Sequence, residues 1–238
     1  MSGHSKWSQI KHKKAAEDAK RSKYFSKLSA MITVAAREGG GDPEKNPKLR
    51  VAIDKAKEFN MPKDNIERAI KRGTGELEGV KLEEVIFEAY GPEGVGILIK
   101  TITDNKNRTA NEIRSILNKH NMKMANSGSV SFQFKEKIVF RIPKESYSEE
   151  LALSLIEAGV EDIKEEQEAV VLISSPQFFS QIKSFLEKRQ IPVLESSFEL
   201  VSAQEQEVSQ EAKEALESLF EALDQQPEVE EIYSTLRS

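Results

Sequence analysis

The sequence predicts an α+β protein of three domains, with an N-terminal helical bundle followed by two ferredoxin-like α/β domains, one inserted in the other. Three observations support this prediction. Apolar residues recur three and four apart in the first third of the chain, and short runs rich in branched and aromatic residues then replace them. Residues 137–200 give the order β-α-β-β-α-β. The segment after residue 205 supplies the helix and strand that the domain before the insertion lacks.

The first domain, residues 1–78, is expected to contain three amphipathic helices. The first helix runs from Ala15 to Glu38 and stops at Gly39-Gly40-Gly41. The second starts at Asn46-Pro47, an N-cap followed by a first-turn proline, and ends before Asn60. The third follows Pro62 and stops at Gly73. Their apolar stripes are Tyr24, Phe25, Leu28, Ile32 and Ala35, then Leu49, Ala52, Ile53 and Ala56, then Ile66, Ala69 and Ile70. No stripe is wide enough to be stable alone, so we expect the helices to bury one another.

The second domain, residues 79–134 plus 206–238, is expected to open with a hairpin. Its elements are strands Val85–Tyr90 and Val95–Thr103 around Gly91-Pro92-Glu93-Gly94, a helix with Ile113, Ile116 and Leu117 on its apolar side, and a strand in which Val130, Phe132 and Phe134 alternate with polar residues. Thr109 and Glu112 have capping-box spacing and are expected at the start of the helix. The tail adds a helix with Ala212, Leu216, Leu219, Phe220 and Leu223 on one side and a strand from Val229 to Tyr233.

The third domain, residues 135–205, is the expected insertion. Its elements are strand Lys137–Ile142, helix Ser148–Ala158, strands Val160–Lys164 and Ala169–Ile173, helix Pro176–Lys188 and strand Val193–Val201.

Charge is distributed unevenly along a chain whose formal net charge is −5. Residues 1–75 hold 18 basic and 9 acidic side chains, residues 76–144 hold 11 and 9, and residues 145–238 hold 6 and 22. A cationic first domain attracts a polyphosphate, because each phosphate that it neutralises releases condensed counterions. The acidic end repels the same polymer. The charge pattern therefore predicts a nucleic-acid partner.

Composition argues against several other classes of protein. The chain has no cysteine, and its histidines, His4, His12 and His120, lack the spacing of a metal site. No base, nucleophile and orienting group can be named together, so we expect no catalytic residue, no metal and no cofactor. No apolar run is long enough to span a bilayer, and no secretory signal opens the chain. We expect a cytoplasmic protein without a membrane partner or a small-molecule substrate.

Two segments are candidates for contact with phosphates. The run from Lys6 to Lys14 combines cations with one aromatic side chain, and cations recur through the rest of the first domain. The residues are Lys6, Trp7, Lys11, His12, Lys13, Lys14, Lys20, Arg21, Lys23, Lys27, Arg68, Lys71 and Arg72. The alternative is a solvated arm whose Trp7 packs on the protein itself.

The second candidate is the segment from Thr103 to Thr109, which joins a strand to a helix. Free backbone N–H groups, the helix dipole and the cations Lys106 and Arg108 converge there, so the segment suits an anion. The alternative is that Asp104, Asn105 and Asn107 shape the turn and cap the helix.

The sequence resembles the YebC/PmpR family. The motifs that carry this resemblance are Met-Ser-Gly-His-Ser-Lys-Trp at 1–7, Ile10-Lys11-His12, Lys14-Ala15-Ala16, Gly39-Gly40-Gly41-Asp42-Pro43, residues 60–70 (NMPKDNIERAI), Gly73-Thr74-Gly75, Tyr90-Gly91-Pro92, Thr103-Asp104-Asn105, Asn107-Arg108-Thr109 and Gly128-Ser129-Val130-Ser131. The resemblance implies three domains and a cytoplasmic non-enzyme. Members are described as probable DNA-binding transcriptional regulators, and several as ribosome-associated factors that relieve stalls; mitochondrial relatives are translational activators of cytochrome c oxidase.

By analogy with that family, nine motif positions are expected to contact nucleic acid: Lys6, Trp7, Lys11, His12, Lys14, Lys63, Arg68, Asn107 and Arg108. The tail departs from the family, because Pro227-Glu228 stands where members usually have two aspartates.

These observations favour a non-enzymatic nucleic-acid-binding regulator of gene expression, with DNA binding and regulation of transcription as the first hypothesis. A translation factor that binds ribosomal RNA in the ribosome is the alternative, because no helix-turn-helix, zinc finger, basic zipper or RNA-binding aromatic motif settles the polymer. The second alternative is a protein-binding adaptor whose acidic domain docks a basic partner.

Overall fold

The computed structural model describes residues 18–237, with side chains described from residue 24 onward. The chain is α+β, as predicted, and forms two compact units: one holds residues up to Lys135 together with those from Ser202, and the other is Glu136–Val201. No helix in the described residues is long and apolar enough to cross a membrane. The division of the first unit at residue 78 stays a prediction.

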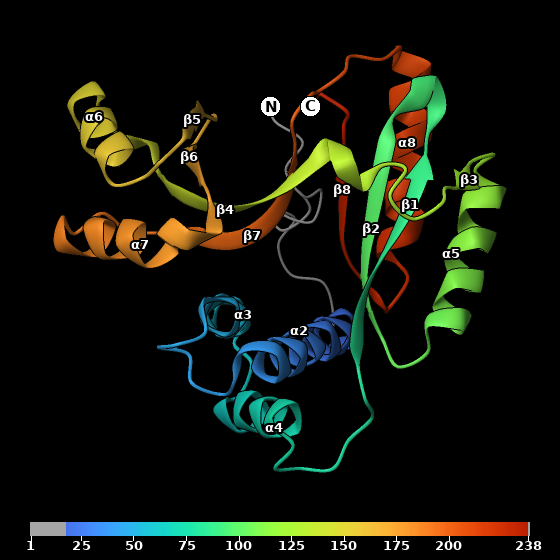
Figure 1. Cartoon of the computed structure of the whole chain (residues 1–238), viewed down its shortest axis with the longest axis horizontal. Coiled ribbons are helices and arrows are strands. Elements are labelled where there is room, and N and C mark those ends of the chain that lie inside the picture. The colour runs from blue at the N-terminus through green and yellow to red at the C-terminus, as the bar shows by residue number, and fades with distance from the viewer. Residues whose placement is uncertain (1–17, 238) are drawn as a thin grey trace. The chain divides into compact units, whose positions relative to one another are not determined.

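Three helices form the bundle of the first unit (Figure 1): α2 (Asp18–Gly39), α3 (Pro47–Glu58) and α4 (Lys63–Thr74). The Asn46 side chain caps α3 by accepting from the backbone N–H of Leu49 at 3.1 Å, as the sequence predicts. The bundle core is made of the apolar side chains Leu28, Ile32, Ala35, Ala36, Leu49, Ala52, Ile53, Ala56, Met61, Ile66 and Ala69. The three predicted stripes therefore do bury one another.

The prediction that α4 stops at Gly73 is wrong. The helix continues to Thr74 and ends at Gly75, whose φ of 83° is in the left-handed region that favours glycine. Gly73 is needed for close packing instead. A Cβ at Gly73 would lie 2.4 Å from the Thr33 carbonyl oxygen and 2.6 Å from the Ala36 Cβ. The missing side chain lets α2 and α4 approach each other.

The same unit contains a four-stranded antiparallel sheet in the order β3-β1-β2-β8. Its elements are β1 (Glu83–Tyr90), the 3-10 turn η1 (Pro92–Gly94), β2 (Gly96–Thr103), α5 (Lys106–Lys119), β3 (Lys123–Met124), α8 (Gln210–Asp224) and β8 (Val229–Ser234). β1 and β2 form the predicted hairpin, with Phe87 opposite Ile99. α5 and α8 bury their apolar sides in one core with this sheet.

Pairing of β8 with β2 confirms that the chain returns after the insertion to complete this sheet. The predicted apolar side of α8 is buried along its length, with Leu216, Leu219 and Leu223 each at 0% exposure.

The predicted strand at Val130–Phe134 is wrong. Residues Ser131–Gln133 form the 3-10 turn η2, Phe132 is 77% exposed, and the short β3 is the third strand. The cause is the buried carboxylate of Glu88 on β1. It accepts from the backbone N–H groups of Gly128 at 2.6 Å, Val130 at 2.5 Å and Ser131 at 3.0 Å. These bonds fold the segment into a loop over β1.

The inserted unit is a second four-stranded antiparallel sheet, in the order β5-β6-β4-β7. Its elements are β4 (Phe134–Pro143), η3 (Lys144–Ser146), α6 (Glu149–Glu157), β5 (Asp162–Glu165), β6 (Ala169–Ser174), η4 (Pro176–Phe178), α7 (Phe179–Lys188) and β7 (Glu195–Ser202). The order β-α-β-β-α-β is the predicted ferredoxin-like one. The rings of Phe140 on β4 and Phe179 on α7 stack with centroids 5.6 Å apart.

Buried ion pairs connect the bundle to the sheet of the first unit. Lys55 Nζ on α3 lies 3.0 Å from Glu231 Oε1 on β8, and Lys27 Nζ on α2 lies 3.5 Å from Asp224 Oδ1 at the end of α8. All four side chains are less than one fifth exposed. Removing one partner of such a pair would leave a buried charge uncompensated, so each pair fixes how the bundle meets the sheet.

Within the sheet, Lys100 on β2 lies between two carboxylates. Its Nζ is 3.0 Å from Glu84 Oε2 on β1 and 3.3 Å from Glu230 Oε2 on β8, although this Glu230 oxygen accepts no hydrogen bond within the described residues. Burial alone would lower the pKa of Lys100, but the charges of Glu230 and Glu84 outweigh it, and the pKa is raised. Lys100 therefore stays charged and holds three strands together.

The close packing at Gly73 gives the first testable prediction. Gly73→Ala places a methyl group against the Thr33 backbone, which cannot move without separating α2 from α4, so the free energy of unfolding should fall by about 1–3 kcal/mol. Gly79→Ala is the matched control, because its Cβ would meet only the flexible Arg72 side chain at 3.5 Å. Urea unfolding measures both variants. Equal stability of the two variants would contradict the packing role.

The second prediction concerns Glu88. Burial raises its pKa, but the backbone N–H donors of Gly128, Val130 and Ser131 outweigh burial, so its folded pKa lies below the ordinary 4.5. The resulting stabilisation is present above pH 4.5 and is lost as the pH falls through the folded pKa. Glu88→Gln should lower the free energy of unfolding at neutral pH by about 2 kcal/mol. The difference from the parent protein should shrink in acid; a constant difference from pH 7 to pH 3 would refute this account.

Candidate nucleic-acid interface

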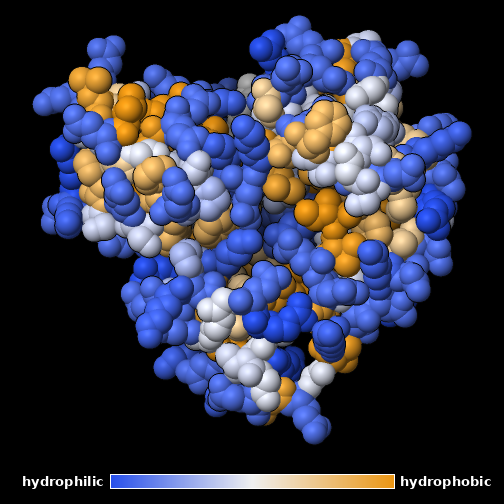
Figure 2. Space-filling view, viewed as in Figure 1, coloured by the Kyte–Doolittle hydropathy of each residue, from blue (hydrophilic) through white to orange (hydrophobic). Residues whose placement is uncertain are grey.

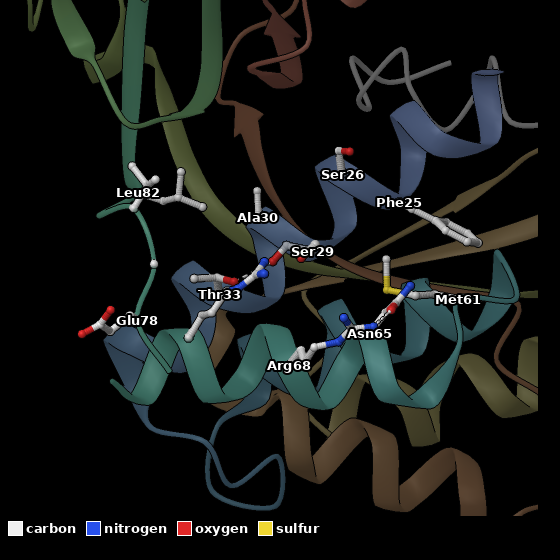
Figure 3. A pocket seen from close by; sticks show the side chains of 13 residues that line it. Phe25, Ser26, Ser29, Ala30, Thr33, Met61, Asn65, Arg68, Glu78 and Leu82 are labelled. Carbon is white, nitrogen blue, oxygen red and sulfur yellow. Dashed lines mark hydrogen bonds between the residues drawn. The ribbon is translucent and has the colours of Figure 1, made fainter. Parts of the chain in front are cut away.

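The first unit contains a groove of about 920 Å³ between α2, α4 and the segment that leads from α4 to β1 (Figure 3). Phe25, Ser26, Ser29, Ala30 and Thr33 of α2 line it, together with Met61, Asn65, Arg68 and Arg72 on or just before α4 and Glu78, Gly79, Val80 and Leu82 of the connecting segment. The groove thus combines apolar surface with hydroxyl, amide and guanidinium groups.

The two helices hold the walls of the groove together by packing and by one hydroxyl. Thr33 Oγ1 lies 2.8 Å from the Ser29 carbonyl oxygen on α2 and 3.1 Å from the Ala69 carbonyl oxygen on α4. Phe25 and Met61 approach each other at one end of the groove, and Leu82 and Glu78 lie toward the other end (Figure 3). The Arg37 side chain donates to the Leu82 carbonyl oxygen and so ties the connecting segment to α2.

Arg68 and Arg72 supply the positive charge of the groove. They are four residues apart on α4, so they lie on one side of the helix. Arg68 Nη2 donates to Asn65 Oδ1 at 2.6 Å (Figure 3). Arg68 Nε lies 3.3 Å from the Asp64 carbonyl oxygen. Within residues 24–237 neither arginine pairs with a carboxylate, and Glu78 is the single carboxylate lining the groove. Both guanidinium groups therefore have donors left for phosphate oxygens.

The other two predicted residues of α4, Lys63 and Lys71, are exposed. Lys63 Nζ lies 3.5 Å from Glu67 Oε1 one turn further along. Such an exposed pair contributes little to stability and is open to exchange for a phosphate. Lys71 has no carboxylate partner among the side chains that the structure describes.

Nine predicted residues of the first domain are not placed as side chains. Lys6, Trp7, Lys11, His12, Lys13 and Lys14 lie outside the described residues, and Lys20, Arg21 and Lys23 are described only as backbone of α2. Their role in binding stays a prediction.

One cation that the sequence analysis counted toward the basic surface does not belong to it. Lys27 is 8% exposed and pairs with Asp224, so its charge is neutralised inside the protein. Lys55, also basic and in the same bundle, is neutralised by Glu231. The positive charge that the described part of the first domain presents to a partner is thus smaller than its composition suggests.

The predicted anion site at Thr103–Thr109 is already filled by carboxylates of the protein. Arg108 Nη2 lies 2.5 Å from Asp104 Oδ1 and also binds Glu228, whose other oxygen accepts from the Thr109 hydroxyl at 2.5 Å. Asn105 caps α5 by accepting from the Arg108 backbone N–H at 3.1 Å. The contacts of Asp104 and Asn105 agree with the turn-shaping alternative, and Thr109 lies inside the helix rather than at its cap. Anion binding by this segment stays a prediction.

Glu228, the residue at the position where the tail departs from the family, is part of this cluster. It links the α8–β8 connection to the start of α5. The remaining predicted residues of the segment, Lys106 and Asn107, are exposed and are free of carboxylate partners within the described chain.

The α2 side of the groove was not predicted from the sequence. Ser26, Ser29 and Thr33 are three and four apart, a spacing that places them on one face beside Phe25. The spacing can be read from the sequence, but it shows that these residues line a groove only when the position of α4 is known. In residues 18–237 no group of three or more histidine, aspartate or glutamate side chains could hold a metal ion.

Comparison with known proteins identifies the family. Residues 5–76 match the TACO1/YebC protein N-terminal domain, and residues 82–236 match the TACO1/YebC second and third domain. A probable transcriptional regulatory protein of Persephonella marina is 49% identical over 98% of this chain and 95% of its own length. One of Thermotoga maritima with the same description is 48% identical over 98% of this chain and 93% of its own length.

A solved structure also matches. The crystal structure of a conserved hypothetical protein from Aquifex aeolicus superposes with a TM-score of 0.85 at 41% identity, and the match covers 97% of this chain and 96% of the other. The fold is therefore shared over nearly the whole length. Because both family domains and these relatives cover almost all of the sequence, the resemblance seen in its motifs is confirmed: the chain belongs to the TACO1/YebC family.

Proposed function

We propose that this protein is a non-enzymatic regulator of gene expression that binds nucleic acid in the cytoplasm, with DNA as the partner and transcription as the regulated process. The groove between α2 and α4 carries the proposal, because it brings two arginines that pair with no carboxylate of residues 24–237 beside hydroxyl and amide groups. The description of the bacterial relatives as probable transcriptional regulatory proteins supports the choice of process.

The proposed mechanism is binding without bond formation. Arg68 and Arg72 contact phosphates from one side of α4, while Ser26, Ser29 and Asn65 bind sugar or phosphate oxygens across the groove. Lys63 and Lys71 extend the cationic surface of α4, and the cations of the sequence from Lys6 to Lys14 add further positive charge. The acidic side chains elsewhere in the chain repel the polymer and so limit the orientations in which it binds.

Ribosomal RNA is the second candidate partner. None of the described helices carries a recognisable set of base-reading side chains, and contacts of the groove type read the backbone rather than the sequence. Structured RNA is recognised largely through its shape, phosphates and 2′-hydroxyls, which suits such a surface. Under this alternative the same groove serves a translation factor that relieves stalled ribosomes.

The third prediction tests the groove. Arg68→Gln with Arg72→Gln removes two phosphate contacts without adding negative charge, so affinity for nucleic acid should fall and the slope of log affinity against log salt should decrease by about 2. The control is Lys45→Gln with Lys57→Gln, which removes two exposed cations of the same bundle that lie outside the groove lining. An unchanged slope in the arginine variant, with folding intact, would rule out the groove as the phosphate site.

The polymer is identified by crosslinking in cells followed by sequencing of both DNA and RNA. Enrichment at promoters supports the transcriptional proposal, and contacts to ribosomal RNA support the alternative. If nuclease treatment leaves the copurifying partners and the sedimentation unchanged, neither polymer is the partner, and a protein-binding adaptor replaces both.

A further inference from the structure

The exposed side of α5 carries a row of amide side chains and cations. Asn107, Asn111, Arg114 and Asn118 follow one another four, three and four residues apart, so they lie along one face over about 17 Å. All four are exposed. Opposite to them, Thr109, Ile113 and Leu117 are buried against the sheet. In Figure 2 the margin of the molecule over α5 is mostly hydrophilic.

Part of this row is hollowed. A shallow groove of about 450 Å³ is lined only by Asn111, Arg114, Ser115, Asn118 and Lys119. Arg114 Nη1 donates to Asn111 Oδ1 at 2.9 Å, which orients both side chains, and Arg114 Nη2 contacts the Met124 sulfur at 4.0 Å. Every lining group is thus a hydrogen-bonding or cationic one.

No carboxylate of residues 24–237 pairs with Lys106, Arg114 or Lys119. Arg108, in contrast, is neutralised by Asp104 and Glu228. The one acidic residue of α5, Glu112, is half-buried at the side of the helix and binds Gln226. The open face of α5 is therefore positive.

The neighbouring helix shows that this pattern is not a general property of solvent-exposed helices in this protein. α8 contacts α5 and packs in the same core, yet its exposed side is acidic, with Glu211, Glu214, Glu217 and Glu221. Asparagine is also a poor helix former compared with alanine, glutamate or lysine. Three asparagines in one exposed row cost helix stability, and that cost is unexplained if the row only faces water.

We propose that this α5 face is a contact surface for the ribose-phosphate backbone of structured RNA. The proposal rests on the nucleic-acid binding proposed above. It adds a second place of contact, at which RNA, the second candidate partner, is favoured over DNA. Arg114 and Lys119 bind phosphate oxygens, and the amides of Asn107, Asn111 and Asn118 bind ribose hydroxyls. The acidic side of α8 excludes the polymer from the adjacent surface.

The amides favour RNA over DNA for a chemical reason. An asparagine side chain offers both donors and an acceptor, and the ribose 2′-hydroxyl is likewise a donor and an acceptor. Phosphates alone, which DNA shares, would be bound as well by lysine and arginine. The three asparagines beside the cations therefore match a backbone that presents hydroxyls as well as phosphates.

The fourth prediction separates the role of the amides in RNA binding from any effect on folding. In the full-length protein, Asn111→Ala with Asn118→Ala should weaken binding of a duplex RNA by about fivefold and leave binding of the DNA duplex of the same sequence within about twofold. The duplexes are about 20 base pairs long, which exceeds the roughly 16 that a double-stranded-RNA module spans. The melting temperature should stay equal or rise, because alanine is the better helix former.

Two further variants keep the test decisive. Arg114→Gln should weaken binding of both duplexes by a similar factor, since it removes a phosphate contact. Gln177→Ala with Gln181→Ala removes two exposed amides of the inserted unit and should change neither affinity.

The outcomes distinguish this inference from the proposed function. If the parent protein binds RNA and neither α5 variant weakens that binding, the α5 surface is refuted while the groove proposal stands. If the amide variant weakens RNA and DNA binding equally, the assignment to ribose fails. If the parent protein binds neither duplex, the proposed function itself fails.

Discussion

The pairing of β8 with β2 is the constraint on which the first unit depends. It closes a sheet whose first strands and last strand are separated in sequence by the whole inserted unit. The returning segment also provides much of the core, because Leu216, Leu219 and Leu223 of α8 are fully buried in it. Without this pairing the hairpin of β1 and β2 would have neither its second covering helix nor a partner for the free edge of β2.

The same returning segment also neutralises several cations of the first unit. Asp224, Glu228 and Glu231 neutralise Lys27, Arg108 and Lys55, and Glu230 helps to neutralise Lys100. These carboxylates are far from the lysines in sequence and adjacent to them in space. Arg68 and Arg72 on α4 and Arg114 and Lys119 on α5 are among the exposed cations that no carboxylate of residues 24–237 pairs with. The returning segment therefore reduces the positive charge that the first unit presents to a partner.

Sequence patterns predicted elements well wherever local chemistry decides the structure. The Asn46 cap, the glycines at 39–41, the hairpin and all six elements of the inserted unit depend on propensity, periodicity and turn residues that a short window contains. The errors have a common origin in long-range contacts. The alternation around Phe132 indicates a strand, but the Glu88 carboxylate, 42 residues before Val130, folds that segment into a loop. Gly73 resembles a helix stop, yet its role is to admit the backbone of α2.

The candidate interface, too, was predicted from the sequence only in part. The sequence by itself determined the family, the helical and α/β composition and the return of the tail, because motifs and periodicity are properties of the chain. It also predicted Arg68 and Arg72 as contact residues, which stays a prediction. Only the tertiary structure decided that Lys27 is buried, that Arg108 already binds Glu228, and that α2 and α4 enclose a groove. The physical reason is that the availability of a charge depends on which carboxylate lies within a few ångströms of it, and that distance is set by packing between segments that no local pattern connects.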